Sequence, residues 1–408
     1  SSDQLERYPC LASLPVTSDL RGYFTSDAEA YSWSLAHLAP KTLPHAAYSL
    51  GHNHDNVTID PWPAFGLDWA ISRGLFIFNL SPDDKYPSEA ALFDQIMGQI
   101  GTDSVMYGWA EPEMSYTARV SAHGGIVLND QAPNLSFWGR LPPTRSNLQW
   151  PVSHLAPPDI DNSTYYLVFQ TNEGDTAKIL ASQMNGEWLS DTRGSAPVAW
   201  GVNPLLNKLL PALVSFYLDT ATSNDTFFAG PSGAGYIYPT PLTPDALTNY
   251  TRRVNALVQE YGPQWADIWD TTCDDAGKLS AYHLGAPSLH GLSRHGTPNG
   301  NATNCFFEDK TPLFSADHTL WYPQLNATHP LDDLESRITR VMQMNRPPFF
   351  ILVYGLLNKP TNPVTVPEFA AAMANRLGDK GVRVVGVDDV VRLAPQVAPP
   401  QFVPCKGM

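Results

Sequence analysis

The chain is poor in basic residues and lacks a long apolar run, and both shortages exclude classes of partner. Lys and Arg number 25 against 40 Asp and Glu, so the formal net charge is −15 at pH 7. Because no basic stretch could neutralise phosphates, we expect neither nucleic acid nor a membrane as a partner. The longest apolar run, at 347–354, has the length of a β-strand and falls well short of the ~18 residues of a membrane-spanning helix. An acidic surface suits an extracellular enzyme that works on neutral or cationic polymers.

Cysteine is also scarce. The four cysteines can be paired in three ways. Chain ends often lie close together, so we predict that Cys10 pairs with Cys405. Cys273 and Cys305 flank a stretch rich in Gly, His and Asn, and we predict that they form a second disulfide. The alternative is four free, buried thiols in a cytosolic enzyme.

Glycan acceptor sequons are frequent, which is typical of a secreted protein. The Asn-x-Ser/Thr sequons begin at Asn56, Asn79, Asn134, Asn162, Asn224, Asn249, Asn301 and Asn326. Asn79 is set aside as an acceptor, because Pro82 follows it closely and it ends a predicted strand. The chain starts at Ser1 without a basic segment and an apolar run. We therefore expect this numbering to begin at the mature end of a secreted, extracellular glycoprotein.

The 408 residues, 43% of them hydrophobic, can bury a large core. A proline-rich and weakly patterned stretch at 140–161 marks the predicted domain boundary. We expect an N-terminal α/β region at 1–155 that contributes to the active site, and a second domain at 156–408.

Short apolar strands alternate with helix-like segments in both regions, which predicts parallel sheets. The predicted strands are 75–78, 104–107, 165–170, 198–202, 226–229, 267–269, 349–354 and 382–387. The predicted helices are 88–100, 176–184, 204–218, 244–261, 331–345 and 366–377. With six or seven such units, we predict a (β/α) barrel-like second domain, distorted or seven-stranded, rather than an open sheet. In either case the chemistry belongs at the carboxyl ends of the strands.

The strand at 165–170 leads directly into two carboxylates. Glu173 and Asp175 are separated by Gly174, which permits a tight turn at the strand end. Two acids close together perturb each other's pKa values, which general acid and base catalysis requires. Alternatively, Asp175 caps the helix that begins at Thr176, and Glu173 is solvated.

A second strand end combines an aromatic residue with acids. Trp109 is followed by Glu111 and Glu113. The face of a Trp ring can stack on the C–H face of a sugar ring, while a nearby carboxylate acts on the glycosidic bond. A surface loop with acids at the start of a helix would have the same pattern.

The segment 230–239 is a glycine-rich turn that presents Tyr236 and Tyr238 at alternate positions. It lacks the Lys-Ser/Thr ending of a phosphate loop, and Ala234 stands where a nucleophile elbow needs its second glycine. We predict a platform for a flat ligand, with Asp225, ahead of this turn, as a further acid of the site. A tight turn that packs Tyr236 into the core is the alternative.

Trp200 and Asn203 form a further strand end with an aromatic ring and an amide. An aromatic wall and an amide donor suit a sugar and its hydroxyl groups, and Asn172 can serve as a second amide. Trp200 could equally belong to the core.

The run Gly-Ala-Gly-Tyr-Ile-Tyr-Pro at 233–239 resembles the signature of the GxGYxYP putative glycoside hydrolases. The segments at 108–113, 172–175 and 200–204 are similar to the same family, in the same order, and the resemblance covers most of residues 70–395. It implies a barrel-like glycosidase without naming a substrate. The family pattern Asp-Gly-Asp-Asn stands here as Glu173-Gly174-Asp175-Thr176, which favours Asp175 over Glu173 as the catalytic acid.

We therefore predict hydrolysis of glycosidic bonds by two carboxylates, without a cofactor or a metal, in a monomer. The predicted catalytic residues are Asp175 and Glu113, with Glu173 and Asp225 as alternates. The predicted substrate-binding residues are Trp109, Asn172, Trp200, Asn203, Tyr236 and Tyr238.

Two alternatives remain from the sequence. A metal-dependent carbohydrate esterase could use His52, His54 and Asp55, or Asp274 and Asp275, as ligands. A non-catalytic carbohydrate-binding protein would use the same aromatic residues.

Overall fold

The computed structural model describes residues 15, 19–51, 66–129, 132, 134–151, 159–172, 174, 176–270, 276–295, 304–319, 328–356, 364–399 and 401–405. The chain divides into two compact units, Ser1–Thr42 and Leu43–Met408. The domain boundary predicted near residue 155 stays a prediction. In the first unit, α2 (Asp27–His37) begins after Ser26, whose side chain accepts a hydrogen bond from the Glu29 amide. A short 3-10 helix, η2 (Ala39–Lys41), follows.

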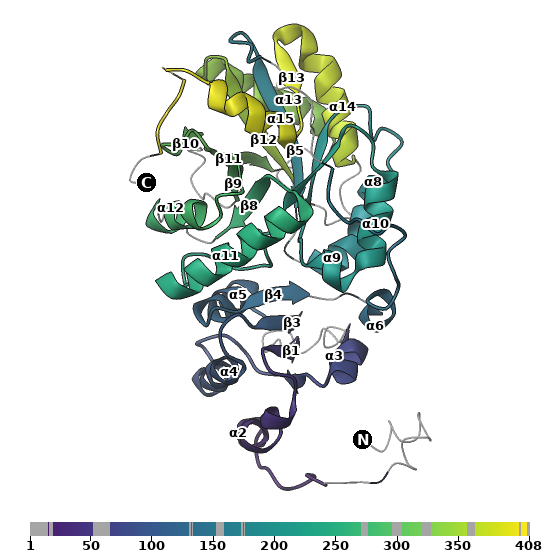
Figure 1. The fold of residues 1–408 in the computed structure, drawn as a ribbon, viewed down its shortest axis with the longest axis vertical. Coiled ribbons are helices and arrows are strands. Elements are labelled where there is room, and N and C mark those ends of the chain that lie inside the picture. The colour runs from purple at the N-terminus through teal and green to yellow at the C-terminus, as the bar shows by residue number, and fades with distance from the viewer. Residues whose placement is uncertain are drawn as a thin grey trace. The chain divides into compact units, whose positions relative to one another are not determined.

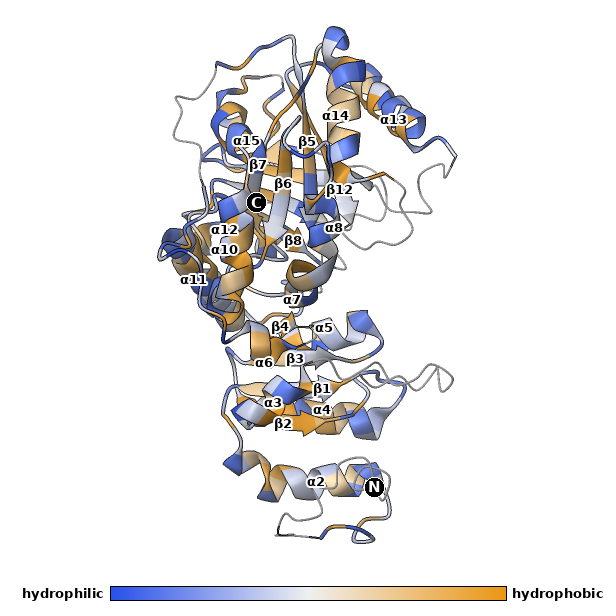
Figure 2. Cartoon of the chain, turned by 90° about the vertical axis from the view of Figure 1, so that its right-hand side faces the viewer, coloured by the Kyte–Doolittle hydropathy of each residue, from blue (hydrophilic) through white to orange (hydrophobic). Residues whose placement is uncertain are grey.

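The second unit contains a small parallel sheet in the order β2-β1-β3-β4. Its strands are β1 (Ala46–Leu50), β2 (Phe76–Phe78), β3 (Val105–Trp109) and β4 (Ile126–Asn129). The accompanying helices are α3 (Leu67–Arg73), α4 (Pro87–Ile100), α5 (Glu113–Ala122) and α6 (Leu135–Trp138). The strands are apolar along most of their length, as expected where helices cover a parallel sheet, and Figure 2 draws β2 and β4 largely in orange.

The other sheet of this unit is a barrel of parallel strands (Figure 1). Its strands are β5 (Tyr165–Asn172), β6 (Val198–Val202), β7 (Asp225–Ala229), β8 (Trp265–Trp269), β9 (Gly291–His295), β11 (Pro312–Thr319) and β12 (Phe349–Leu356). They pair in the order β12-β5-β6-β7-β8-β9, and β11 pairs with both β12 and β9, which closes the ring. Two short strands flank it, β10 (Cys305–Phe306) beside β11 and β13 (Val382–Val384) beside β5.

Alternation along β5 separates the barrel interior from the helix layer. Tyr166 stacks on Phe350 of β12 inside the barrel, and Gln170 contacts polar groups of β8 and β9. Leu167 and Phe169, at the intervening positions, pack in the core cluster beneath the surrounding helices. Because side chains alternate along a strand, Tyr166 and Gln170 face the barrel interior, and Leu167 and Phe169 face the helices.

Amphipathic helices cover the barrel, and Figure 2 shows α13 mixing blue and orange residues. They are α7 (Thr176–Lys178), α8 (Met184–Trp188), α9 (Leu206–Leu209), α10 (Pro211–Thr220), α11 (Pro244–Tyr261), α12 (Ala276–Gly285), α13 (Pro330–Met344), α14 (Val366–Leu377) and α15 (Val387–Leu393). The short helical turns are η3 (Ile179–Gln183), η4 (Gly378–Lys380) and η5 (Ala394–Gln396). Local sequence sets several ends: Thr243 caps α11, and Thr365 with Glu368 forms a capping box on α14.

The predicted fold class, an α/β chain with a barrel-like domain, is confirmed. Seven strands form the ring, as the sequence allowed. The strands β9 and β11 were not predicted, because their Ser, Arg, His and Asp residues interrupt an apolar pattern. One strand was predicted at 382–387, whereas β13 ends at Val384 and α15 begins at Val387.

The predicted disulfide pairing is wrong, because Cys305 is bonded to Cys405. The C-terminal segment runs beside β10, where the Phe306 amide donates to the Val403 carbonyl and the Cys405 amide to the Phe306 carbonyl. This pairing brings Cys405 to Cys305 and excludes both predicted partners. Cys10 and Cys273 lie outside the described residues.

Among the helices that the structure describes, none has the length and apolar character needed to cross a membrane.

The Cys305–Cys405 bond closes a loop over a sequence separation of 100 residues. Loop-closure entropy then predicts that Cys405→Ser lowers the free energy of unfolding by about 4 kcal/mol. Thermal unfolding of the variant and of the wild type, each with and without reductant, measures the effect. Equal melting temperatures of variant and wild type under non-reducing conditions would contradict this expectation.

Candidate active site

The carboxyl ends of neighbouring barrel strands bring polar residues to one edge. Asn172 ends β5, Asn203 follows β6, Gly230 follows β7 and Asp270 follows β8. Because these strands are parallel and adjacent, the four positions line the same mouth of the barrel. Asn172, Asn203 and Asp270 are all buried there.

The segment 230–239 connects this mouth to the small sheet. Val127 of β4 and Tyr236 exchange two backbone hydrogen bonds, of 3.0 and 2.8 Å. Gly235 makes this approach possible: its φ is +119°, and a Cβ there would lie 2.9 Å from the Ile126 Cδ1 atom. The glycine therefore supplies both the left-handed backbone and the close contact with β4.

Tyr236 joins the segment to a carboxylate of the small-sheet region. Its hydroxyl donates to Glu113 Oε1 at 2.7 Å and lies 3.1 Å from the Tyr238 hydroxyl. Glu113 is the first residue of α5, which follows β3. Two residues that the sequence analysis placed in one site are thus in direct contact, although 123 positions separate them.

Glu111 holds the start of α5 in place. Its Oε1 accepts from the Trp109 indole at 3.1 Å, and its Oε2 accepts from the Glu113 amide at 3.1 Å. The Trp109 ring packs against Tyr116, with ring centroids 5.4 Å apart, and is buried. Trp109 therefore contacts the element that carries Glu113, and its predicted sugar contact stays a prediction.

Both tyrosines of the segment remain donors at neutral pH. Burial, together with the charge of Glu113, raises the pKa of Tyr236 well above its usual value. Burial also raises the pKa of Tyr238 to about 12, and Glu113 and Asp270 contribute to that increase. The phenol of Tyr236 therefore stays protonated and donates to Glu113.

Asn203 carries an unused hydrogen-bond donor at the barrel mouth. Its Oδ1 accepts from the Leu205 amide at 3.0 Å, while its buried Nδ2 has no partner among the residues that the structure describes. A buried N–H group without an acceptor costs free energy, so a ligand that supplies an acceptor here would be stabilised.

Asp270 is a strand-end carboxylate that the sequence analysis missed. It follows β8 directly, is buried, and accepts from the Thr240 amide at 2.6 Å. Its charge acts on Tyr238, which also experiences the charge of Glu113. Its signal in the sequence is an acid directly after a predicted strand, here the strand at 267–269. The same signal pointed to the acids at 173 and 175.

Glu173 and Asp175 lie outside the described residues, but Gly174 between them is described. A Cβ at Gly174 would lie 2.7 Å from Cε1 of Tyr236. The backbone of this turn therefore runs against the face of the tyrosine that donates to Glu113.

The structure separates Asp225 and Trp200 from the mouth of the barrel. Asp225 is the first residue of β7, at the opposite edge, and its carboxylate accepts from Arg193 at 2.5 Å and from the Trp200 indole at 2.8 Å. Trp200 pairs with Thr171, so its side chain faces the helix layer, where it packs on Trp188. Neither residue is placed to act as predicted.

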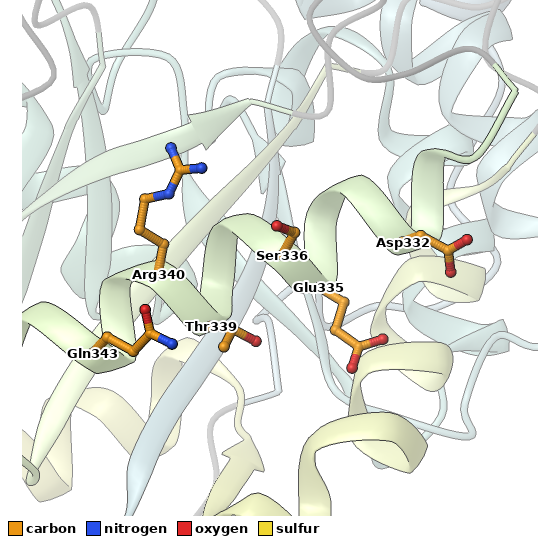
Figure 3. Close-up of a pocket in the computed structure, with 6 residues that line it drawn as sticks. All are labelled: Asp332, Glu335, Ser336, Thr339, Arg340 and Gln343. Carbon is orange, nitrogen blue, oxygen red and sulfur yellow. The ribbon is translucent and has the colours of Figure 1, made fainter.

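Two surface hollows lie outside this arrangement. One, of about 440 Å³, is lined only by α13 residues, among them Asp332, Glu335 and Arg340 (Figure 3). The other, of about 630 Å³, lies along α5, where Arg119 donates to Asp94 and to Asp84. Asp332 and Glu335 of the first hollow pair with Arg376 of α14, and Arg119 of the second pairs with Asp84 and Asp94. Neither hollow is lined by the strand-end residues of the barrel mouth.

Among the described residues, no three carboxylate, imidazole or thiolate groups gather in a way that could hold a metal ion. The metal ligands considered from the sequence, His52, His54, Asp55, Asp274 and Asp275, lie outside the described residues.

Two family models match the chain. Residues 163–394 match the model described as GxGYxYP putative glycoside hydrolase C-terminal domain, and residues 61–140 match the GxGYxYP third domain. No curated protein matches the chain.

Two solved structures match the chain. A crystal structure of a putative hydrolase from Bacteroides thetaiotaomicron VPI-5482 has a TM-score of 0.77 at 19% identity, over 97% of this chain and 73% of that chain. A putative polysaccharide deacetylase from Mycobacterium smegmatis has a TM-score of 0.42 at 9% identity, over 63% of this chain and 99% of that chain. The first similarity supports the fold alone, and the second is too weak to support an argument.

The contact between Gly174 and Tyr236 predicts that even a methyl group at position 174 lowers the stability of the protein. Gly174→Ala should lower the free energy of unfolding by about 1–3 kcal/mol, because the buried ring cannot move away from the added methyl group. Gly186→Ala, in α8 with open space around the Cβ position, is the control and should match or exceed wild-type stability. Equal melting temperatures for the two variants would mean that the ring of Tyr236 is not fixed against this turn.

Proposed function

The chain belongs to the GxGYxYP putative glycoside hydrolase family, and from this premise we propose that it is a secreted glycosidase with two catalytic carboxylates. The hydrogen bond from Tyr236 to Glu113 carries the proposal. It joins the family signature to a strand-end carboxylate of a different sheet, at the mouth of the barrel. The substrate is a polysaccharide or an oligosaccharide.

Glu113 is the carboxylate that acts in its ionised form. A hydrogen bond donated to a carboxylate favours the charged state, and Tyr236 supplies one. Asp175 is the proton donor, because it adjoins Gly174, whose backbone lies against Tyr236. Asp175 gives its proton to the glycosidic oxygen as the C–O bond breaks, while Glu113 either attacks the anomeric carbon or takes a proton from the attacking water.

Asp270 is the alternate proton donor. It is buried at the adjoining strand end, and its charge acts on the same tyrosine as that of Glu113. Glu173 remains a further alternate from the sequence. The distance between the two catalytic carboxyl groups sets the stereochemical outcome, with roughly 5–5.5 Å for retention and 6.5–9.5 Å for inversion.

The sugar is held by amides and phenols. Asn203 has an unpaired donor for a hydroxyl group, and Asn172, Tyr236 and Tyr238 lie at the same mouth. Among the described residues of this site the charged groups are carboxylates, so it favours a neutral or amino sugar over an anionic one. This preference agrees with the net charge of −15.

Extracellular location is supported by the Cys305–Cys405 disulfide and by exposed sequons. Asn134 and Asn162 are exposed, whereas the Asn224 amide donates to the Gly194 carbonyl at 2.6 Å. Asn134 and Asn162 are therefore better placed as glycan acceptors than Asn224. Asn56, Asn301 and Asn326 lie outside the described residues.

The catalytic proposal predicts that Glu113→Gln and Asp175→Asn each abolish sugar release, by about 1,000-fold or more, without unfolding the protein. The purified protein is incubated with a panel of neutral, amino and anionic polysaccharides, and released oligosaccharides are detected by mass. Glu187→Gln is the control: its buried carboxylate accepts from the Val366 amide at the start of α14, in the helix layer, and activity should persist.

Each alternative function gives a different result in the same experiment. Release of acetate alone, lost on addition of a chelator, would indicate a metal-dependent esterase. Binding without any product, and equal in both acid variants, would indicate a carbohydrate-binding protein. Full activity of Asp175→Asn with loss in Asp270→Asn would transfer the proton-donor role to Asp270.

The proposed secretion predicts N-linked glycans when the protein is expressed through a eukaryotic secretory pathway. Enzymatic removal of N-glycans should lower the measured mass, and Asn134→Gln with Asn162→Gln should each remove one glycan. Asn224→Gln is expected to leave the glycan mass unchanged. A mass equal to that of the bare chain would contradict the prediction.

A further inference from the structure

Asp267 lies at the centre of β8 with its side chain inside the barrel, completely buried. Burial of a carboxyl group costs free energy unless hydrogen bonds offset the loss of water. Four donors surround this group, from Asn172, Trp269, Ser293 and Gln170.

The two oxygens of Asp267 have different kinds of partner. Oδ2 accepts from the Asn172 amide at 3.1 Å and from the Trp269 indole at 2.9 Å. Oδ1 accepts from the Ser293 hydroxyl at 2.6 Å and from the Gln170 amide at 3.4 Å. The Oδ2 partners lie toward the barrel mouth, and the Oδ1 partners lie one layer deeper.

Both Oδ2 partners reach the candidate site. The Trp269 ring meets the Tyr236 ring edge-on, with centroids 5.3 Å apart and an interplanar angle of 88°. Tyr236 in turn donates to Glu113. The backbone carbonyl of Asn172 accepts from the Tyr354 hydroxyl at 2.5 Å, which fixes the end of β5 just before the predicted acids.

We propose that Asp267 is a positioning residue for this site. One carboxylate oxygen fixes the Asn172 amide and the Trp269 indole, and Trp269 fixes the ring of the tyrosine that holds Glu113. This role rests on the proposed glycosidase function and goes beyond it, since Asp267 contacts neither substrate nor reacting atoms. A misplacement of about 1 Å at a catalytic group can cost roughly 100-fold in rate.

The chemistry of the partners predicts how substitutions differ. Asp267→Leu removes both acceptors, so the Trp269 indole and the Asn172 amide lose their hydrogen bonds to this side chain. Asp267→Asn keeps one acceptor: its oxygen can take the Oδ2 position, while Ser293 and Gln170 can each turn to accept from the new amide. If Asp267 contributed to stability alone, the folded fractions of the two variants would have the same kcat.

The experiment measures kcat and KM of folded Asp267→Leu and Asp267→Asn on the substrate found for the wild type. We expect kcat of Asp267→Leu to fall roughly 100-fold with a smaller change in KM, and Asp267→Asn to recover to within about tenfold of wild type. Trp269→Phe, which keeps an aromatic ring but loses the indole N–H, should lower kcat as well and provides a variant less prone to misfold.

Asp225→Leu is the matched control. Asp225 is also buried on a barrel strand and also accepts from an indole, that of Trp200, but at the opposite edge. This variant should lose stability while the folded fraction keeps its kcat. If kcat of Asp267→Leu is within threefold of wild type, or if Asp267→Asn recovers nothing, the proposal is overturned.

Failure of the proposed function can be told apart from failure of this inference. Absence of any sugar release by the wild type would reject the glycosidase. Crystal structures of the two Asp267 variants then test the inference directly. It is supported if Trp269 and Asn172 move in Asp267→Leu and keep their places in Asp267→Asn, and it is rejected if they stay in place in both.

Discussion

Val127 and Tyr236 exchange two backbone hydrogen bonds, and through them the small sheet and the barrel share one site. Glu113 belongs to the helix that follows β3, whereas Tyr236 belongs to the loop that follows β7. This short antiparallel bridge fixes the loop beside β4, and the Tyr238 amide adds a hydrogen bond of 3.0 Å to the Ser121 hydroxyl of α5. The two contacts together bring Tyr236 to Glu113, the first residue of α5.

The bridge also explains the composition of the glycine-rich segment. Gly235 occupies a left-handed conformation at close contact with Ile126, a place that no side chain could take. Tyr236 then points back toward Glu113, and Tyr238 lies beside it. Gly235 therefore allows the contact with β4, and the two tyrosines form the hydrogen bonds around Glu113.

The barrel interior changes from apolar to polar toward its mouth. Near the amino ends of the strands, Tyr166 and Phe350 stack in an apolar layer. One layer further, Gln170, Asp267 and Ser293 form a buried polar network. An apolar base thus supports a hydrogen-bonded layer, and that layer contacts residues of the barrel mouth, Asn172 and Trp269.

The sequence by itself determined the class of fold, because alternating apolar strands and amphipathic helices have few stable arrangements. It also predicted Glu113 and Tyr236 as site residues, since polar residues directly after a strand and a glycine-rich turn are local patterns. Tertiary structure alone decided which of these residues meet. Register turned Trp200 toward the helix layer, and the start of β7 placed Asp225 at the edge opposite the mouth. The pairing of β10 with the C-terminal segment brought Cys305 to Cys405. Such contacts depend on strand order and register across many residues, which local sequence does not encode.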